Sequence, residues 1–156
     1  MKKIIAGIVA TMLLMTGVAF ADRTSVVNPV QVLTESFTVP TGWNDGGSAA
    51  ATKAMSLTLP AGAIPIAWRA TTTTAIDATS AATLLVGITG VTDKFSASDG
   101  QDIDAVGVYG DSALGEAVGA DGISSAQTIL LTLTEDSEWG DISAGAFTLE
   151  FFYLKP

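Results

Sequence analysis

From residue 22 onward, apolar residues alternate with polar ones, and no stretch keeps the 3.6-residue spacing of a helix over three turns. The final segment, 145–154, is the clearest case, because large apolar side chains fall there on every second residue. Successive side chains of a strand point to opposite faces of a sheet, so this spacing puts them all on one face. We therefore expect an all-β chain whose C-terminal strand is built into a sheet.

The same alternation, interrupted by turns rich in glycine and proline, predicts several earlier strands. These segments are short and rich in threonine and β-branched residues, which is typical of an antiparallel β-sandwich or jelly roll. We therefore predict a single domain of that class. The earlier strands are expected at residues 32–39, 55–59, 64–74, 84–88 and 126–134.

Two of the turns contain the sequence Ala-Gly-Ala. The first, at 60–63, joins the predicted strands 55–59 and 64–74, so we expect these two strands to pair as a hairpin. The second, at 144–146, follows strand 126–134 after a longer excursion and suggests a second hairpin with a related turn.

Strand 64–74 contains one tryptophan and one proline. Trp68 alternates with Ile64 and Ile66, so all three are expected to face the core. Pro65 cannot donate a backbone hydrogen bond, which predicts an edge position or a bulge at the start of the strand.

The first 21 residues have the pattern of a secretory signal peptide. Lys2 and Lys3 form a basic start, Ile4–Phe20 carries no charge, and Ala19-Phe20-Ala21 supplies the small residues that precede a cleavage site. The alternative is an N-terminal apolar helix that remains as a membrane anchor, although this segment is at the short limit for a span. The predicted division is therefore signal peptide 1–21, extended leader 22–31 and β-sandwich domain 32–156.

The composition excludes whole classes of function. The chain has no His and no Cys, so it lacks an imidazole base, a thiolate nucleophile, a Ser-His-Asp triad and an ordinary zinc site. Its net charge is −9, and loss of residues 1–21 would make it more negative still. Such a chain repels the phosphate backbone of nucleic acids. We therefore expect a protein that is not an enzyme and does not bind nucleic acid.

One acidic, glycine-rich stretch, Asp99–Asp111, is the candidate for a metal site. Ca²⁺ binds several oxygen ligands and accepts carboxylates from flexible loops. The spacing does not match the EF-hand loop, so we prefer a solvated loop between two strands and keep Ca²⁺ as the alternative. No other cofactor is expected. The candidate ligands are Asp99, Asp102, Asp104 and Asp111.

Two tryptophans lie in polar turns beside acidic residues. An aromatic ring flanked by hydrogen-bonding groups is typical of a sugar-binding face. The alternative, which we prefer, is that the rings cap the ends of the sandwich and bury their bodies while the N–H groups stay solvated. The candidate residues for binding a glycan or a partner are Trp43, Asn44, Asp45, Trp139 and Asp141.

Several stretches resemble small β-sandwich virion proteins of tailed bacteriophages. They are Leu59-Pro-Ala-Gly-Ala-Ile-Pro-Ile-Ala-Trp68, then 71–77, and then 82–95 with its Val-Gly-Ile-Thr-Gly-Val-Thr-Asp sequence. The resemblance extends over about residues 33–154 and ends in an aromatic strand. It implies a subunit that decorates or completes the phage head. A signal peptide departs from the pattern of this group, whose members assemble in the bacterial cytoplasm.

The expected function is therefore structural. We expect a non-enzymatic subunit of an exterior assembly, such as a phage head decoration protein, whose partners are copies of itself or a capsid or cell-surface scaffold. The leader 22–31 could add a strand to the sheet edge of a neighbour. The alternative is a secreted carbohydrate-binding or filament module. The expected location is extracellular if Met1–Ala21 is cleaved and the virion surface otherwise, with membrane contact only through residues 1–21.

Overall fold

The computed structural model describes residues 29–45, 49–79, 81–111, 122–135, 139 and 142–155. These residues contain eight β-strands, and among them no helix is long and apolar enough to cross a membrane. The prediction of an all-β domain is confirmed, while the predicted signal peptide lies outside the described residues. The strands are β1 (Val30–Thr38), β2 (Ala50–Leu59), β3 (Ile64–Thr74), β4 (Ala82–Gly87), β5 (Gln101–Asp102), β6 (Gly107–Asp111), β7 (Gln127–Glu135) and β8 (Ala146–Leu154).

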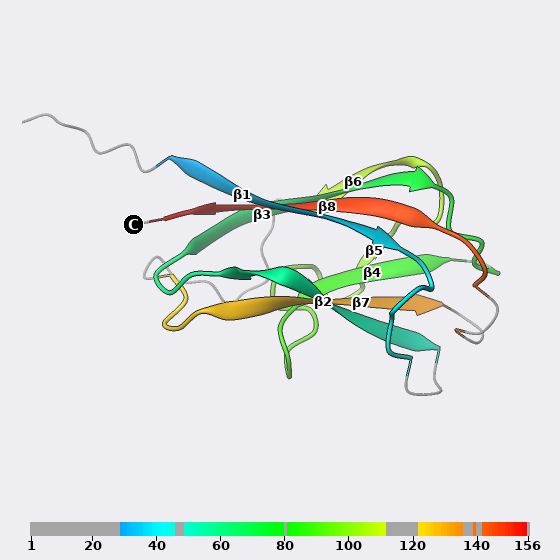
Figure 1. Cartoon of the computed structure of the whole chain (residues 1–156), viewed down its shortest axis with the longest axis horizontal. Helices are drawn as coiled ribbons and strands as arrows, with labels where there is room; N and C mark the ends of the chain where they lie inside the picture. The colour runs from blue at the N-terminus through cyan, green and yellow to red at the C-terminus, as the bar shows by residue number, and fades with distance from the viewer. Residues whose placement is uncertain are drawn as a thin grey trace, which may run out of the picture.

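The strands form two antiparallel four-stranded sheets that pack face to face (Figure 1). Sheet A has the order β1-β8-β3-β6, and sheet B has the order β2-β7-β4-β5. The pairs β1–β8, β2–β7, β3–β6 and β4–β5 are those of one long hairpin that turns between β4 and β5. Rolling this hairpin up adds the pairs β3–β8 and β4–β7. This is a jelly roll, so the predicted fold class is confirmed.

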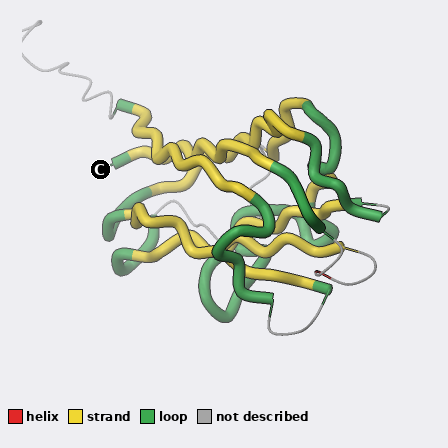
Figure 2. The backbone as a smooth tube through the Cα atoms, turned by 45° about the vertical axis from the view of Figure 1, so that its right-hand side comes forward, coloured by secondary structure: helices red, strands yellow, loops and turns green. Residues whose placement is uncertain are grey.

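The strands on either side of each Ala-Gly-Ala turn do not pair with one another. β2 and β3 lie in different sheets, and so do β7 and β8, so both predicted hairpins are wrong. Figure 2 shows the strands in two layers, with loops connecting them. In the first turn, the Gly62 N–H donates to the Ile123 carbonyl and the Ile123 N–H donates to the Ala63 carbonyl. The segment before β7 therefore supplies hydrogen-bond partners for the backbone of this turn. Alternation reveals the apolar face of a strand, but it is the same for strands that lie side by side and for strands that face each other across a core.

A β-bulge near the start of β3 changes the orientation of Ile66. Pro65 and Ala67 lie opposite consecutive residues of β8, which leaves Ile66 as an extra residue. Trp68 is buried as predicted, whereas Ile66 is exposed. The bulge predicted at Pro65 is confirmed. The inward orientation predicted for Ile64 and Ile66 is wrong, because one inserted residue shifts the alternation and leaves Ile64 on the outer face, beside Leu154.

The acidic stretch Asp99–Asp111 contains two short strands, although the sequence favours a loop there. β5 pairs with β4, and β6 runs antiparallel to β3 at one edge of sheet A. The exposed Val108 and the two glycines of β6 give no apolar alternation that would reveal a strand. The edge position explains this composition, because an edge strand needs no continuous apolar face to hold its place.

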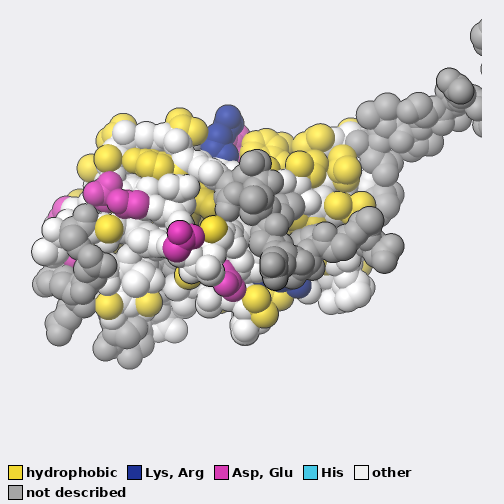
Figure 3. All heavy atoms as spheres, turned by 180° about the vertical axis from the view of Figure 1, so that it is seen from behind, with side chains coloured by type: hydrophobic (Ala, Val, Ile, Leu, Met, Phe, Trp, Pro, Cys, Tyr) yellow, Lys and Arg dark blue, Asp and Glu magenta, His cyan; other side chains and the backbone are white. Residues whose placement is uncertain are grey.

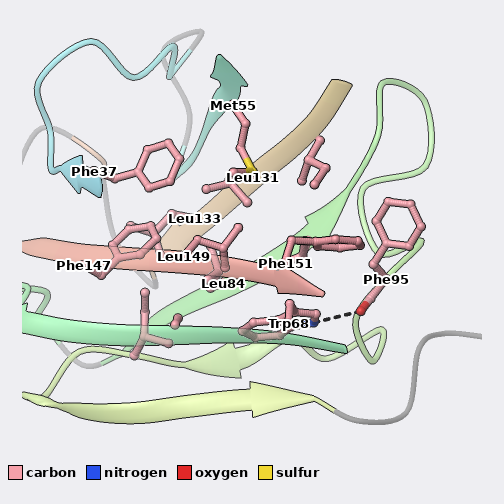
Figure 4. Packing of buried hydrophobic residues seen from close by; sticks show 14 of the residues in the cluster. Phe37, Met55, Trp68, Leu84, Phe95, Leu131, Leu133, Phe147, Leu149 and Phe151 are labelled. Atoms are coloured by element: carbon pink, nitrogen blue, oxygen red, sulfur yellow. Dashed lines mark hydrogen bonds between the residues drawn. The ribbon is translucent and has the colours of Figure 1, made fainter. Parts of the chain in front are cut away.

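The core is one layer of apolar side chains between the two sheets (Figure 4). β8 lies between β1 and β3 and buries every second residue, so the prediction that the C-terminal strand is built into a sheet is confirmed. Its side chains meet those of β7 across the layer. The buried residues of these two strands that form the centre are Phe147, Leu149, Phe151, Ile129, Leu131 and Leu133.

The loop 88–100 is anchored to this core by Phe95. The Trp68 Nε1–H donates to the Phe95 carbonyl oxygen at 2.8 Å, and both residues are buried (Figure 4). The Phe95 ring also packs edge-on against Phe151, with the ring centroids 5.1 Å apart. A polar group from sheet A therefore fixes a loop that leaves sheet B after β4.

Glu35 connects the neighbouring edges of the two sheets. Its carboxylate oxygen Oε2 accepts hydrogen bonds from the Ser56 N–H at 2.7 Å and from the Ser56 hydroxyl at 2.9 Å. The register of β2 against β7 is interrupted between Ala54 and Thr58, which leaves the Ser56 backbone available for this contact. We call this pair of hydrogen bonds the Glu35–Ser56 clasp.

We predict that Trp68→Phe lowers the free energy of unfolding by about 2–4 kcal/mol, since it leaves a cavity and removes the donor for the buried Phe95 carbonyl. Urea denaturation measures the loss. Val91→Ala, at an exposed position of the same loop, is the control and should cost less than about 0.5 kcal/mol. Equal effects of the two variants would contradict the anchoring role of Trp68.

Candidate functional site

Asp102 supports the backbone around β5. Its Oδ1 accepts hydrogen bonds from the Ala82 N–H and the Asp104 N–H, both at 3.2 Å. Asp99 lies exposed in the turn before β5, and the Asp104 carbonyl accepts a hydrogen bond from the Ile76 N–H. The acidic stretch therefore joins the start of β4 and the loop after β3.

The four predicted calcium ligands are distributed over both sheets. Asp102 belongs to β5 in sheet B, whereas Asp111 ends β6 in sheet A, opposite Trp68. The side chain of Asp111 lies outside the described part of the structure. Among the side chains that are described, no three acidic groups come together in a way that could hold a metal ion. Calcium binding by this stretch stays a prediction.

Trp43 and Trp139 come together at one end of the core. Their ring centroids are 5.6 Å apart, and Trp43 also contacts Phe37 and Phe147 with centroid distances of 6.3 Å and 6.2 Å. The Trp43 Nε1–H donates to the Thr38 carbonyl at 3.1 Å. We call the four rings the aromatic cap. The sequence suggested two separate tryptophan turns and gave no sign that they would share one site.

The polar candidates beside Trp43 are tied into the backbone. The Asn44 N–H and carbonyl both pair with Thr52, and Lys53 donates to the Gly42 carbonyl at 2.8 Å. Asp45 is half-buried, while Asp141 lies outside the described residues. The turn that carries Trp43 is thus docked against β2.

The burial of the aromatic cap limits what it can bind. Trp139 is only 5% exposed, so its ring offers no free face on which a sugar could stack. Trp43 is half-buried, and its N–H already has an acceptor. The geometry favours the capping interpretation, and the glycan-binding hypothesis would rest on Trp43 alone.

Asp77 fastens two loops at one end of the sandwich, a role that its sequence context did not signal. Its Oδ1 accepts hydrogen bonds from the N–H groups of Ser143 and Ala144 at 2.9 Å and 2.8 Å. Its Oδ2 accepts a hydrogen bond from the Ser143 hydroxyl. The Ser143 hydroxyl and the Ala144 N–H hold the pKa of Asp77 below its ordinary value of 3.8. The carboxylate therefore joins the loop after β3 to the turn before β8.

The outer face of sheet A is unusually apolar at one end. Val30 and Val32 of β1 lie opposite Leu154 and Phe152 of β8 on this face. Arg69 and Glu150 pair near its middle, with Nε and Oε2 2.7 Å apart. The sequence holds a signal for this face, because the run Phe-Phe-Tyr-Leu at 151–154 is apolar on both sides of the strand.

The chain matches no protein-family model and no curated protein. Among solved structures it is similar to a chain of the capsid asymmetric unit of cyanophage Pam1, with 17% identity, a TM-score of 0.54, and coverage of 81% of this chain and 85% of that chain. A chain in the capsid of Ralstonia phage GP4 has 18% identity, a TM-score of 0.49 and the same coverage. At such identities the first likeness shows a shared fold. The resemblance to phage virion β-sandwich proteins is thus confirmed at the level of the fold.

The variant Trp43→Ala tests whether Trp43 caps the core or binds a glycan. If Trp43 belongs to the aromatic cap, the variant should lose about 2–3 kcal/mol of unfolding free energy, measured by urea denaturation. Leu57→Ala, at an exposed site on β2, is the control. Unchanged stability together with loss of binding on a glycan panel would instead support the carbohydrate-binding hypothesis.

Asp77→Asn should make the protein less sensitive to acid. The folded pKa of Asp77 is lowered, so its stabilising effect is complete above the unfolded value of 3.8 and is lost as the pH falls through the lower folded value. We expect the wild type to melt higher than the variant near neutral pH and the difference to shrink below about pH 4. Asp99→Asn controls for net charge. A difference in Tm that does not change with pH would contradict this assignment.

Proposed function

We propose that this chain is a non-enzymatic structural subunit on the exterior of a virion, with phage head decoration as its specific form. The observation that carries the proposal is the complete jelly roll, shared with a chain of the cyanophage Pam1 capsid over 81% of this chain. Jelly rolls occur in viral capsid proteins, but they also occur in lectins and cupins, so the fold alone does not decide the function.

The chemistry of the chain supports a structural role. Without His or Cys, the catalytic groups that remain are carboxylates, hydroxyls and a few lysines. Two of the aspartates, Asp77 and Asp102, accept backbone hydrogen bonds that hold loops in place. Their geometry serves the fold and leaves them engaged on the protein itself.

The architecture also suits a subunit that works by contact. The first and last strands pair along their whole length, so the two ends of the described domain are held together in one sheet. A rigid sandwich of this kind presents two broad faces and several loops to its surroundings. We place it on the virion surface, and export would apply only if residues 1–21 are removed.

Purified virions test the proposal. The chain should band with virions in a density gradient at a constant ratio to the main shell protein, and intact mass should give its N-terminus. The control is virions of a phage that lacks the gene for this chain. Purified protein added to these virions should restore the band. Recovery of the chain only in the medium, with none on virions, would refute the virion role.

A further inference from the structure

β1 is held unevenly along its length. In its first five residues, 30–34, the side chains are exposed or half-buried and none is fully buried. Leu33 is the apolar residue among them that packs against the core, and it is only half-buried. Figure 1 shows this part of β1 at the end of sheet A where β1 and β2 lie well apart. We call residues 30–34 the N-terminal half of β1.

Within the described residues, no side chain of the N-terminal half bonds to another strand. Gln31, on the same side of the strand as Leu33, donates its side-chain amide to the Pro29 carbonyl at 3.4 Å. Val30 and Val32 are exposed, and Figure 3 shows hydrophobic side chains at the surface along the upper, sheet A side of the molecule. Backbone pairing with β8 and the half-buried Leu33 therefore hold the N-terminal half in place.

The rest of β1 is fixed by contacts that the N-terminal half lacks. The Glu35–Ser56 clasp ties it to sheet B, with distances of 2.7 Å and 2.9 Å. Phe37 is 4% exposed and stacks on Phe147, with the ring centroids 5.2 Å apart. Directly after the strand, the Val39 side chain is buried as well. The change from weak to firm attachment falls at the clasp.

We propose that the N-terminal half of β1 opens from β8 as a unit while the rest of the domain stays folded, and that the Glu35–Ser56 clasp ends this opening. Local opening occurs where few apolar side chains are buried and where backbone hydrogen bonds lie at an exposed edge. The N-terminal half meets both conditions, because it belongs to an edge strand and has no fully buried side chain. The proposal does not depend on the virion role.

Opening uncovers one edge of β8 over residues 150–154. In an antiparallel sheet, alternate residues of a strand direct their N–H and C=O groups to opposite neighbours. Every second residue of 150–154 therefore loses its partner on β1, while the residues between them keep their pairing with β3. Unpaired strand edges add strands from other chains. The closed form thus covers an edge that the open form presents.

Simple fraying of the chain end predicts a different pattern of hydrogen exchange. Fraying weakens gradually with distance from the end, so the protection of the amides would rise steadily from Val30 to Thr38. A segment that opens as a unit gives two levels of protection. The step between these levels should lie between Thr34 and Phe37, where the clasp is.

Native-state hydrogen exchange of the purified protein, followed by NMR for each residue, tests the proposal. Amides of 30–34 and 150–154 that join β1 to β8 should exchange at least about a hundredfold faster than amides that join β8 to β3. Low concentrations of urea should hardly change this fast exchange, because a local opening exposes little surface. Equal protection of alternate amides in 150–154, or a steady rise along β1, overturns the proposal.

The variant Glu35→Ala tests the role of the clasp, with the amides that join β8 to β3 as the internal reference for global stability. The opening should extend beyond Thr34, so the protection of the amides of 35–38 that bond to β8 should fall at least about tenfold relative to the reference. Glu35→Gln keeps one acceptor oxygen and should give a smaller fall. Thr34→Ala changes an exposed side chain beside the clasp and is the matched control. Equal protection of 35–38 in Glu35→Ala and Thr34→Ala overturns the role of the clasp.

A disulfide that locks the strand gives a second test. Val32 lies directly opposite Phe152, and such pairs have Cα atoms about 4.5–5.5 Å apart, which suits a disulfide. The chain has no cysteine of its own. In the double variant Val32→Cys and Phe152→Cys, oxidation should abolish the fast exchange of 30–34, and reduction should restore it. Fast exchange that is the same in the oxidised and reduced forms overturns the proposal.

Discussion

The burial of β8 between β1 and β3 is the constraint on which the rest of this structure depends. Its alternate side chains fill the centre of the core, and its backbone pairs on both edges, so β1 joins the pair β3–β6 in sheet A only through β8. The chain must therefore bring Leu154 beside Val30 before sheet A can close. Contacts between residues so far apart in sequence make folding slow and strongly cooperative.

Six of the eight strands could be predicted from the sequence, all but β5 and β6, and their arrangement largely could not. Period-two alternation identifies β1, β3 and β8, because each has one face in the core. The same pattern cannot show that β2 and β3 face each other across the core instead of pairing. Ile66 was misplaced for a related reason, since a bulge displaces the alternation by one residue and leaves only Pro65 as a sign of it.

The functional surfaces were harder to predict than the fold, because they are made by contacts between distant residues. The sequence marks Trp43 and Trp139 as two separate turns, and only the folded chain brings them together and buries the second ring. Asp77 gave no local signal, since its partners at 143–144 approach it only when β3 and β8 pair in sheet A. The apolar end of the outer face of sheet A has a signal in the run at 151–154, but its meaning depends on knowing which side of β8 faces out.

The Glu35–Ser56 clasp has a consequence for how copies of this protein can grow into larger structures. A free strand edge invites endless addition of further strands, which ends in fibres. Here the Glu35 side chain joins the edge strands β1 and β2 of the two sheets. The opposite edges of the sheets are formed by the short strands β6 and β5. Open-ended strand addition is thus disfavoured at the edges of the sandwich.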